Sequence, residues 1–465
     1  MGLLVCACVA DPTAGLKVNP ADEFRAERAR GELEPIILIP GSLGSRLFNV
    51  KTGEIAWGNF RAMISQLQDG LDLPIDGPRL ADNTDDLRAY RVLDLVEVLN
   101  GEGGGEVRFY AEIIDFLTRT LGYRAAYGDR FFRGHNLFVF FYDWRRSNVE
   151  AAVQLAEMIA TIRRDLGQPT MKFTLLAVSN GGLIGRYYLK YGGADVVSGK
   201  ALNDPLPAGN AGAPDVERLI CLGTPHGGTL DSLKILHEGY TPAALARHHP
   251  PLTIFSMPAS FELLPLPGEK VFAGESGESV DFDLWDPETW IDRGLSVFSP
   301  SEKENLKRDL AGRYNDGQSR DRIFVDKMAQ RERHLRLCLA HARRFLHAIE
   351  GVPAVPCSVI CGANTPTLAR VGALRSGADW DFTFEPRAAE RANDPLTRAM
   401  YAAGDGVVTR RSALGLALPE SNAALRRSGE VFRAAIESIS YTPFRHRSMF
   451  EDEMLKLALG DVLTR

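Results

Sequence analysis

Continuous apolar runs and stretches of helical periodicity alternate along this chain. The apolar runs lack the every-other-residue alternation of a half-exposed strand, so they are typical of strands buried on both faces of a sheet. Between them, apolar residues recur every three to four positions, as in amphipathic helices. This order predicts an α/β fold with a mostly parallel central sheet covered by helices on both faces. The expected strands are PIILIP (35–40), LFVFFYDW (137–144), KFTLLAVS (172–179), RLICLGTP (218–225) and VPCSVICGAN (355–364).

Two S-x-x-E sequences mark expected helix starts, because serine and glutamate at this spacing can cap a first turn reciprocally. Ser147 and Glu150 precede the periodic stretch AAVQLAEMIATIRRDLG. Ser448 and Glu451 precede the last expected helix of the chain.

The alternation fails between residues 231 and 330, where proline and aromatic residues concentrate. We interpret this stretch as an insertion that forms part of a cap over the carboxyl edge of the sheet. The predicted organisation is an N-terminal arm (1–34), a first part of the core (35–230) with a lid loop at about 45–100, the cap-like insertion (231–330), and a second part of the core (331–465) with a long loop at 365–400.

The composition excludes several classes of function. Of 465 residues, 45% are apolar and 25% charged, which is ordinary for a globular protein with a large core. The formal net charge of −6 gives no support to nucleic-acid binding. No run of about 18 apolar residues predicts a membrane span, and the start MGLLVCACVA lacks the basic residues of a secretory signal. We therefore expect a cytoplasmic location or peripheral attachment to a membrane.

No sequence pattern indicates a metal or a cofactor. Cys357 and Cys361 would lie roughly 13 Å apart in one strand, which is too far for a disulfide. The spacing of the six cysteines does not suit a zinc site either, so free thiols are expected. GEGGGE (101–106) lacks the spacing of a dinucleotide or P-loop fingerprint.

The segment Ala177-Val178-Ser179-Asn180-Gly181 has the context of a nucleophile elbow. An apolar strand precedes it, and a stretch with helical spacing follows it. Such a turn holds its serine in a strained conformation and needs small neighbours, so that strand and helix can approach closely. Here alanine stands where the commoner motif has its first glycine. Ser179 is therefore the candidate nucleophile.

A serine hydroxyl needs a general base, and the base needs an orienting carboxylate. His446 is the candidate base, since it lies immediately before the last expected helix. Asp405 is the candidate acid, because the glycines on both sides of it permit a tight turn; Asp379 and Asp381 remain alternatives. Of the other histidines, His135 is set aside because it precedes Ser179, and His226 is interpreted as structural. His237, His248 and His249 are assigned to the cap, and His334, His341 and His347 are expected to be solvated or half-buried on a long basic helix at about 325–350.

A tetrahedral intermediate also needs donors for its negative oxygen. One expected donor is the backbone N–H of Asn180, directly after the nucleophile. The other is the backbone N–H of Leu43, in the loop IPGSLGSRLFN where Gly41 and Gly44 let the chain curl.

Several segments, in order from residue 35 to 446, resemble the lecithin:cholesterol acyltransferase-like family of α/β-hydrolases, which includes lysosomal phospholipases of the A type. The resemblance implies the α/β-hydrolase fold, with Ser179 acylated by a lipid ester and Asp405 and His446 completing a triad. The chain departs from the family in its A-x-S-x-G elbow and in having no cysteine within 45–100, where secreted members close a lid loop with a disulfide. The similar segments are PIILIPGSLGSRL, LFVFFYDWRRS, LLAVSNGGLIGRYYL, ICLGTPHGGT, SMPASFELLP, GDGVVT and the late His446.

The function expected from this resemblance is a serine acyl-ester hydrolase or O-acyltransferase acting on lipids. Its partners would be a lipid or other ester substrate and, transiently, a membrane surface. A general carboxylesterase and a non-catalytic scaffold are the alternatives. Two sets of residues keep two interpretations each. Apolar residues of the lid either contact lipid or belong to the core: Leu47, Phe48, Ile55, Trp57, Phe60 and Met63. Arginines near the expected acid and base either contact a lipid head group or are simply solvated: Arg410, Arg411, Arg445 and Arg447.

Overall fold

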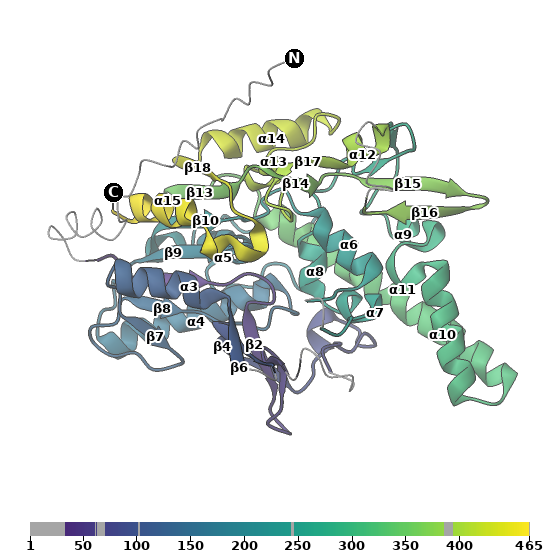
Figure 1. Cartoon of the computed structure of the whole chain (residues 1–465), viewed down its shortest axis with the longest axis horizontal. Coiled ribbons are helices and arrows are strands. Elements are labelled where there is room, and N and C mark those ends of the chain that lie inside the picture. Colours follow the sequence, from purple (N-terminus) through teal and green to yellow (C-terminus); the bar gives the residue numbers. More distant parts are fainter. Residues whose placement is uncertain are drawn as a thin grey trace, which may run out of the picture.

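A seven-stranded parallel sheet forms the centre of the protein in the computed structural model (Figure 1). The structure describes residues 33–60, 62, 70–100, 103–242, 246–385 and 394–464; most of the expected N-terminal arm, with Cys6 and Cys8, lies outside them. The strand order is β18-β13-β10-β9-β1-β8-β7, and every neighbouring pair is parallel. The strands are β1 (Ile36–Ile39), β7 (Ala125–Tyr127), β8 (Leu137–Val139), β9 (Phe173–Val178), β10 (Val216–Leu222), β13 (Cys357–Gly362) and β18 (Ser438–Thr442).

Alternate residues of each strand enter two different cores, because successive side chains of a strand point to opposite faces. In β1, Ile37 and Ile39 pack on the face covered by α4 (Asn148–Leu166), α5 (Gly181–Tyr191) and α11 (Gly317–Ala348). Ile36 and Leu38 pack on the face covered by α3 (Tyr110–Asp115) and α15 (Glu453–Thr464). The predicted fold class, a parallel sheet with helices on both faces, is confirmed.

The segment expected as a long strand at 137–144 is strand only over β8. Beyond Val139 the chain turns to bond with Ser45 at the start of β2 (Ser45–Asn49). The Tyr142 N–H donates to Ser45 Oγ at 3.2 Å, and the Trp144 indole N–H donates to the Ser45 carbonyl at 3.0 Å. These hydrogen bonds take the place of backbone pairing with a neighbouring strand. The strand therefore ends earlier than the sequence predicted.

Residues 231–330 form short helices and two short strands beside the sheet (Figure 1). The figure shows α10 and α11 extending away from the sheet, beyond α6, α7 and α8. The elements are α6 (Leu230–Glu238), α7 (Pro251–Phe255), α8 (Pro258–Glu262), β11 (Phe272–Ala273), β12 (Ser279–Val280), α9 (Pro287–Arg293) and α10 (Pro300–Arg313).

The prediction of a long loop at 365–400 is wrong. Its described part forms β14 (Thr365–Leu368), β15 (Val371–Ser376), β16 (Asp379–Thr383) and α12 (Pro395–Met400). Strand β15 pairs in parallel with β11, and Phe382 lies 5.8 Å from Phe272 between ring centroids. Strand β15 thus has a partner about one hundred positions earlier in the chain, β16 pairs with β15, and β14 pairs with the later segment Tyr401–Gly404.

The segment expected as a lid loop at about 45–100 contains four strands within its described part. Strands β2, β3 (Ile55–Trp57) and β4 (Leu87–Val92) form one antiparallel sheet. Strand β5 (Leu95–Asn100) pairs with β6 (Gly103–Arg108). Leu47 and Trp57 are buried core residues, and Met63 lies outside the described residues.

Two expectations about helix residues are corrected. His334 is fully buried rather than solvated or half-buried, because α7 and α8 cover that side of α11, whereas His341 is half-buried, as expected. His334 Nε2 lies 3.1 Å from the Phe255 carbonyl, and His341 Nε2 lies 3.0 Å from Glu262 Oε1. The cap of α15 is not Ser448: the Leu455 N–H donates to Asp452 Oδ1 at 2.8 Å.

The cysteines in the described ranges are buried free thiols, as expected: Cys221, Cys338, Cys357 and Cys361. Within the same ranges, no His, Cys, Asp and Glu side chains gather in a group of three or more suited to a metal ion. None of the described helices is both long enough and apolar enough to cross a membrane.

Candidate active site

Ser179 stands at a sharp turn between β9 and α5. Its φ is +52°, a left-handed conformation that is costly for a residue with a Cβ. Its N–H donates to the Leu222 carbonyl at 2.8 Å, and its carbonyl accepts from the Gly182 N–H at 3.0 Å. The turn therefore has the strand–turn–helix form expected of a nucleophile elbow.

Small residues around Ser179 allow the helix to approach the strands. A Cβ at Gly181 would lie 2.5 Å from the Ile39 carbonyl oxygen, and a Cβ at Gly41 would lie 2.8 Å from the Cβ of Ser179. Ala177, which replaces the usual first glycine, is fully buried in the sheet core. The elbow thus accommodates the methyl group of Ala177 but leaves no space for one at Gly181.

Gly181→Ala is expected to destabilise the protein by about 1–3 kcal/mol, because the new methyl group meets a rigid backbone oxygen of β1. Thermal unfolding followed by circular dichroism measures the effect. Gly312→Ala in α10 is the matched control: its Cβ meets nothing within 4 Å, so stability should stay equal or rise by up to about 1 kcal/mol. Equal melting temperatures for both variants would contradict the close approach.

The structure brings Ser179, His446 and Asp405 together in one chain of hydrogen bonds. His446 Nε2 lies 2.9 Å from Ser179 Oγ, and His446 Nδ1 lies 2.8 Å from Asp405 Oδ2. His446 begins the 3-10 helix η6 (His446–Glu451), and Asp405 follows β17 (Tyr401–Gly404). The rivals Asp379 and Asp381 lie exposed on β16.

The Asp405 carboxylate is held by its own turn. Its Oδ1 accepts from the N–H groups of Val407 at 2.9 Å and Val408 at 2.7 Å, which leaves Oδ2 for the imidazole. The Asp405 carbonyl accepts from the His446 N–H at 2.9 Å, and the carboxylate side chain is 1% exposed. The Asp405 carboxylate is thus fixed in orientation and shielded from water.

The two expected oxyanion donors lie in turns beside the serine. Leu43 has a φ of +63°, and its carbonyl accepts from the Trp57 indole N–H at 3.0 Å. The neighbouring Gly41 N–H donates to the Tyr110 hydroxyl at 2.7 Å. Within the part of the chain that the structure describes, no protein acceptor takes the backbone N–H of Leu43 or Asn180. Both are free to donate to a ligand.

The side chain of Asn180 belongs to a buried amide pair that the sequence did not reveal. Asn180 Nδ2 donates to Asn148 Oδ1 at 2.6 Å, and Asn148 Nδ2 donates to Asn180 Oδ1 at 2.9 Å. Asn180 also donates to the Tyr142 hydroxyl at 3.1 Å, which in turn donates to the Pro40 carbonyl at 3.0 Å. The pair ties the residue after Ser179 to α4 and to the end of β1.

A buried arginine stabilises the adjoining YDWR segment. Arg145 is fully buried and bonds to Asp85 at 2.6 Å and to Asp143 at 2.7 Å. It also donates to the Leu71 carbonyl at 3.1 Å. These bonds join the region expected as a lid to the turn between β8 and α4.

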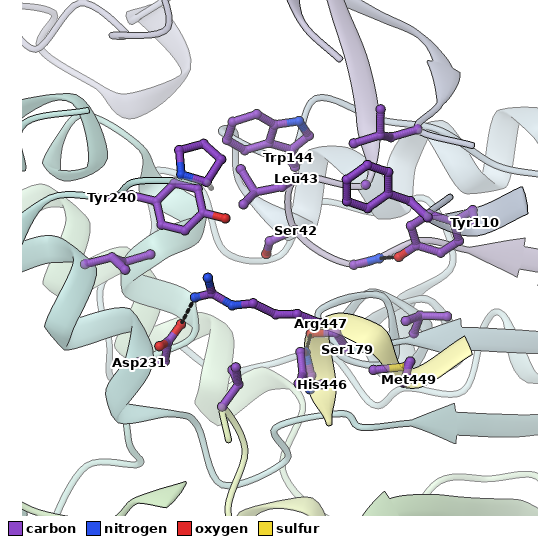
Figure 2. A pocket seen from close by; sticks show the side chains of 18 of the residues that line it. Ser42, Leu43, Tyr110, Trp144, Ser179, Asp231, Tyr240, His446, Arg447 and Met449 are labelled. Carbon is purple, nitrogen blue, oxygen red and sulfur yellow. Dashed lines mark hydrogen bonds and ion pairs between the residues drawn. The ribbon is translucent and has the colours of Figure 1, made fainter. Parts of the chain in front are cut away.

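A cavity of about 520 Å³ opens over Ser179 and His446 (Figure 2). Side chains from the β2–β6 region and from the cap region line it. Of the four arginines near the triad, Arg447 alone is among its lining residues. Prominent apolar members of the lining are Trp57, Phe60, Val96, Phe109, Ile254 and Met257.

Comparisons with known proteins bear on both the family and the fold. The sequence model described as Lecithin:cholesterol acyltransferase matches residues 86–310, which include Ser179 but not Leu43, Asp405 or His446. Among solved structures, sixteen chains match. One of them, described as "The crystal structure of Tle4-Tli4 complex", has a TM-score of 0.50 and 13% identity, covering 92% of this chain and 98% of that chain. At that identity the likeness shows the fold alone. No curated protein matches the chain.

Proposed function

We propose that this chain, whose residues 86–310 match the Lecithin:cholesterol acyltransferase family model, is a serine-dependent lipid acyl-ester hydrolase or O-acyltransferase. The family match supports a lipid acyl hydrolase or acyltransferase in general. The observation that carries the specific proposal is the unbroken Ser179–His446–Asp405 hydrogen-bond chain beneath a largely apolar cavity.

In the first half-reaction, Ser179 Oγ attacks the carbonyl carbon of the ester while His446 Nε2 takes the hydroxyl proton. The Asp405 carboxylate stabilises the imidazolium and fixes its tautomer through Nδ1. The carbonyl π electrons move to oxygen, which becomes the oxyanion. When the intermediate collapses, the ester C–O bond breaks and His446 gives its proton to the leaving alcohol or lysolipid.

The backbone N–H groups of Leu43 and Asn180 are proposed to hold the oxyanion. Donors of this kind lower the barrier by about 3 kcal/mol each when they are preorganised. The Asn180–Asn148 amide pair supports the second donor by fixing its residue in place.

In the second half-reaction, water or another hydroxyl attacks the acyl carbon while His446 Nε2 takes its proton. When this second intermediate collapses, the bond between the acyl carbon and Ser179 Oγ breaks, and His446 returns the proton to Oγ. Water gives hydrolysis, and an alcohol gives acyl transfer. We propose that residues 231–330 act as the cap that forms one side of the acyl site, since Ile254 and Met257 belong to the lining. A lipid substrate would reach this site from a membrane surface, which makes that surface a transient partner.

A fluorophosphonate probe tests the nucleophile directly. Wild-type protein should be labelled with one equivalent, and Ser179→Ala should not be labelled, because the probe reacts only with an activated serine. Labelling is read by intact-protein mass spectrometry. An unlabelled wild type would favour a non-catalytic scaffold, and equal labelling of Ser179→Ala would place the nucleophile elsewhere.

The substrate class is tested by product analysis. Mixed phospholipids with and without an alcohol acceptor should yield lysolipids together with fatty acid or a new acyl ester, detected by mass spectrometry. Turnover confined to short soluble esters would instead indicate a general carboxylesterase.

A further inference from the structure

A buried carboxylate from residues 231–330, the proposed cap, lies at the start of α4. Glu262, the last residue of α8, is fully buried and is not among the residues that line the cavity. Its Oε2 accepts from the Asn148 N–H at 2.8 Å, and its Oε1 accepts from the Ser147 hydroxyl at 2.6 Å. The carboxylate therefore holds the first turn of α4, where the positive end of the helix dipole also favours it.

His341 of α11 adds a third contact to this carboxylate. Its Nε2 lies 3.0 Å from Glu262 Oε1 and 2.8 Å from Ser147 Oγ. Ser147 Oγ also accepts from the Val149 N–H at 3.1 Å, as the N-cap of α4. A buried carboxylate with several partners is fixed in one place, since the loss of any bond would leave a buried polar group without a partner.

Asn148 connects this fixed position to the turn at Ser179. Its backbone N–H is held by Glu262, and its side-chain amide forms the reciprocal pair with Asn180 at 2.6 and 2.9 Å. Asn148 and Asn180 are both fully buried. A shift of the Asn148 backbone would therefore move the Asn180 side chain, and with it the backbone N–H that we propose as an oxyanion donor.

The other end of this connection lies at the acyl cavity. Met257, Ala259 and Leu263, within and next to α8, line the cavity. Glu262 of the same short helix instead bonds to α4. One helix thus contacts the space for the substrate and, through its last residue, the support of the proposed donor.

We propose that Glu262 is a positioning residue for the oxyanion donor of Asn180, acting through Asn148, so that the cap helps to set the geometry of the oxyanion site. The inference rests on the proposed function, because it requires Asn180 to serve as a donor. Such a donor lowers the barrier only when its N–H is aimed in advance at the position of the oxyanion. The apolar neighbours of Glu262 in SFELLP give no local reason for an acid, whereas its partners on α4 give one.

The first test measures kcat, KM and the inhibition constant of a long-chain trifluoromethyl ketone. Ser179 Oγ adds to the ketone carbon, His446 takes the hydroxyl proton, and the ketone oxygen becomes an anion, so the ketone reports on the oxyanion donors. Glu262→Met keeps the volume of the side chain and removes both acceptor oxygens. It should lower kcat by about 10- to 100-fold and weaken binding of the ketone by a similar factor, with KM nearly unchanged.

Glu262→Gln should recover most of this loss. Its amide oxygen still accepts from the Asn148 N–H, and its NH₂ group donates to Ser147 Oγ. Ser147 then gives its hydroxyl proton to His341 Nε2, in the tautomer that carries its proton on Nδ1. Recovery by an uncharged side chain would show that the bond to Asn148, rather than the negative charge, positions the donor.

Glu269→Met is the matched control. This carboxylate of the proposed cap likewise accepts from a backbone N–H, that of Leu418 at 3.0 Å, and from a serine hydroxyl, that of Ser421 at 2.8 Å. Its partners precede α14 (Ala423–Ala434) rather than α4, and Glu269 is not among the lining residues. The variant should lose stability but keep its kcat and its affinity for the ketone.

The second test asks whether Glu262 acts through Asn148. Asn148→Ala breaks the amide pair and should also lower kcat by about 10- to 100-fold. The double variant should be no slower than the slower single variant, because both changes break the same connection. Circular dichroism checks that each variant is folded. An unchanged kcat in Asn148→Ala would overturn the inference even if Glu262→Met does not fold, and so would losses that multiply in the double variant.

Fluorophosphonate labelling separates this inference from the proposed function. A wild type that is neither labelled nor active on esters contradicts the proposed function, and the inference with it. A labelled and active wild type, with a Glu262→Met protein that matches Glu269→Met in kcat and in affinity for the ketone, contradicts the inference alone.

Discussion

Replacement of His446 with alanine is expected to lower kcat on an ester substrate by about 10⁵- to 10⁶-fold, because members of a triad act as one unit. Without the imidazole, Ser179 Oγ loses the acceptor at 2.9 Å and Asp405 Oδ2 loses its donor at 2.8 Å. Any activity that remains would come from the oxyanion donors and from substrate binding. Steady-state kinetics on a chromogenic ester measures the effect.

The fold should survive this change. The His446 ring is 12% exposed, and its backbone N–H, which donates to the Asp405 carbonyl, is kept in the variant. His347→Ala is the matched control, since His347 lies exposed near the end of α11 and should keep full activity. Turnover within tenfold of wild type in a folded His446→Ala protein would show that another group is the base.

The three residues of the proposed triad, which the structure joins by hydrogen bonds, could be selected from the sequence because each lies in a local pattern with a structural reason. Ser179 follows a continuous apolar strand and precedes glycines, and the structure gives it the left-handed backbone that such an elbow requires. Asp405 lies between glycines, where the turn supplies its own N–H donors. His446 lies on a loop that enters a helix near the end of the chain.

The supporting contacts could not be found this way, because they join positions that share no local pattern. Arg145 is held by Asp85, sixty residues earlier in the chain. The amide pair of Asn180 and Asn148 joins the starts of two different helices. Asp231 is an ordinary first-turn acid in sequence, and only the fold brings Arg447 Nη2 to 3.7 Å from its carboxylate.

The predictions of loops at about 45–100 and at 365–400 were wrong for the same reason: both segments contain strands that pair with distant parts of the chain. Strand β15 pairs with β11, and β2 pairs with β4 about forty residues later. Such strands are short and interrupted by glycine or polar residues, so their stability comes from the partner strand rather than from their own propensity. The continuous apolar strands of the α/β-hydrolase core could be predicted without knowing their partner strands.

Asp405→Asn is expected to lower kcat by about 10⁴-fold with little change in structure. The asparagine is isosteric, but its amide has one acceptor where the carboxylate has two. If its oxygen accepts the N–H groups of Val407 and Val408, its NH₂ group faces His446 Nδ1. His446 then carries its proton on Nε2, which can no longer accept the proton of Ser179.

The opposite orientation of the amide is no better, because the NH₂ group would then face two backbone donors that have no other acceptor. Loss of those bonds would loosen the turn that fixes the acid. Asp381→Asn is the control, since Asp381 is exposed on β16 and should keep wild-type kcat. Near-normal turnover in Asp405→Asn, together with a large loss in Asp381→Asn or Asp379→Asn, would assign the acid to β16. The expected pattern instead requires a carboxylate at Asp405, because only two acceptor oxygens can serve the turn and the imidazole at once.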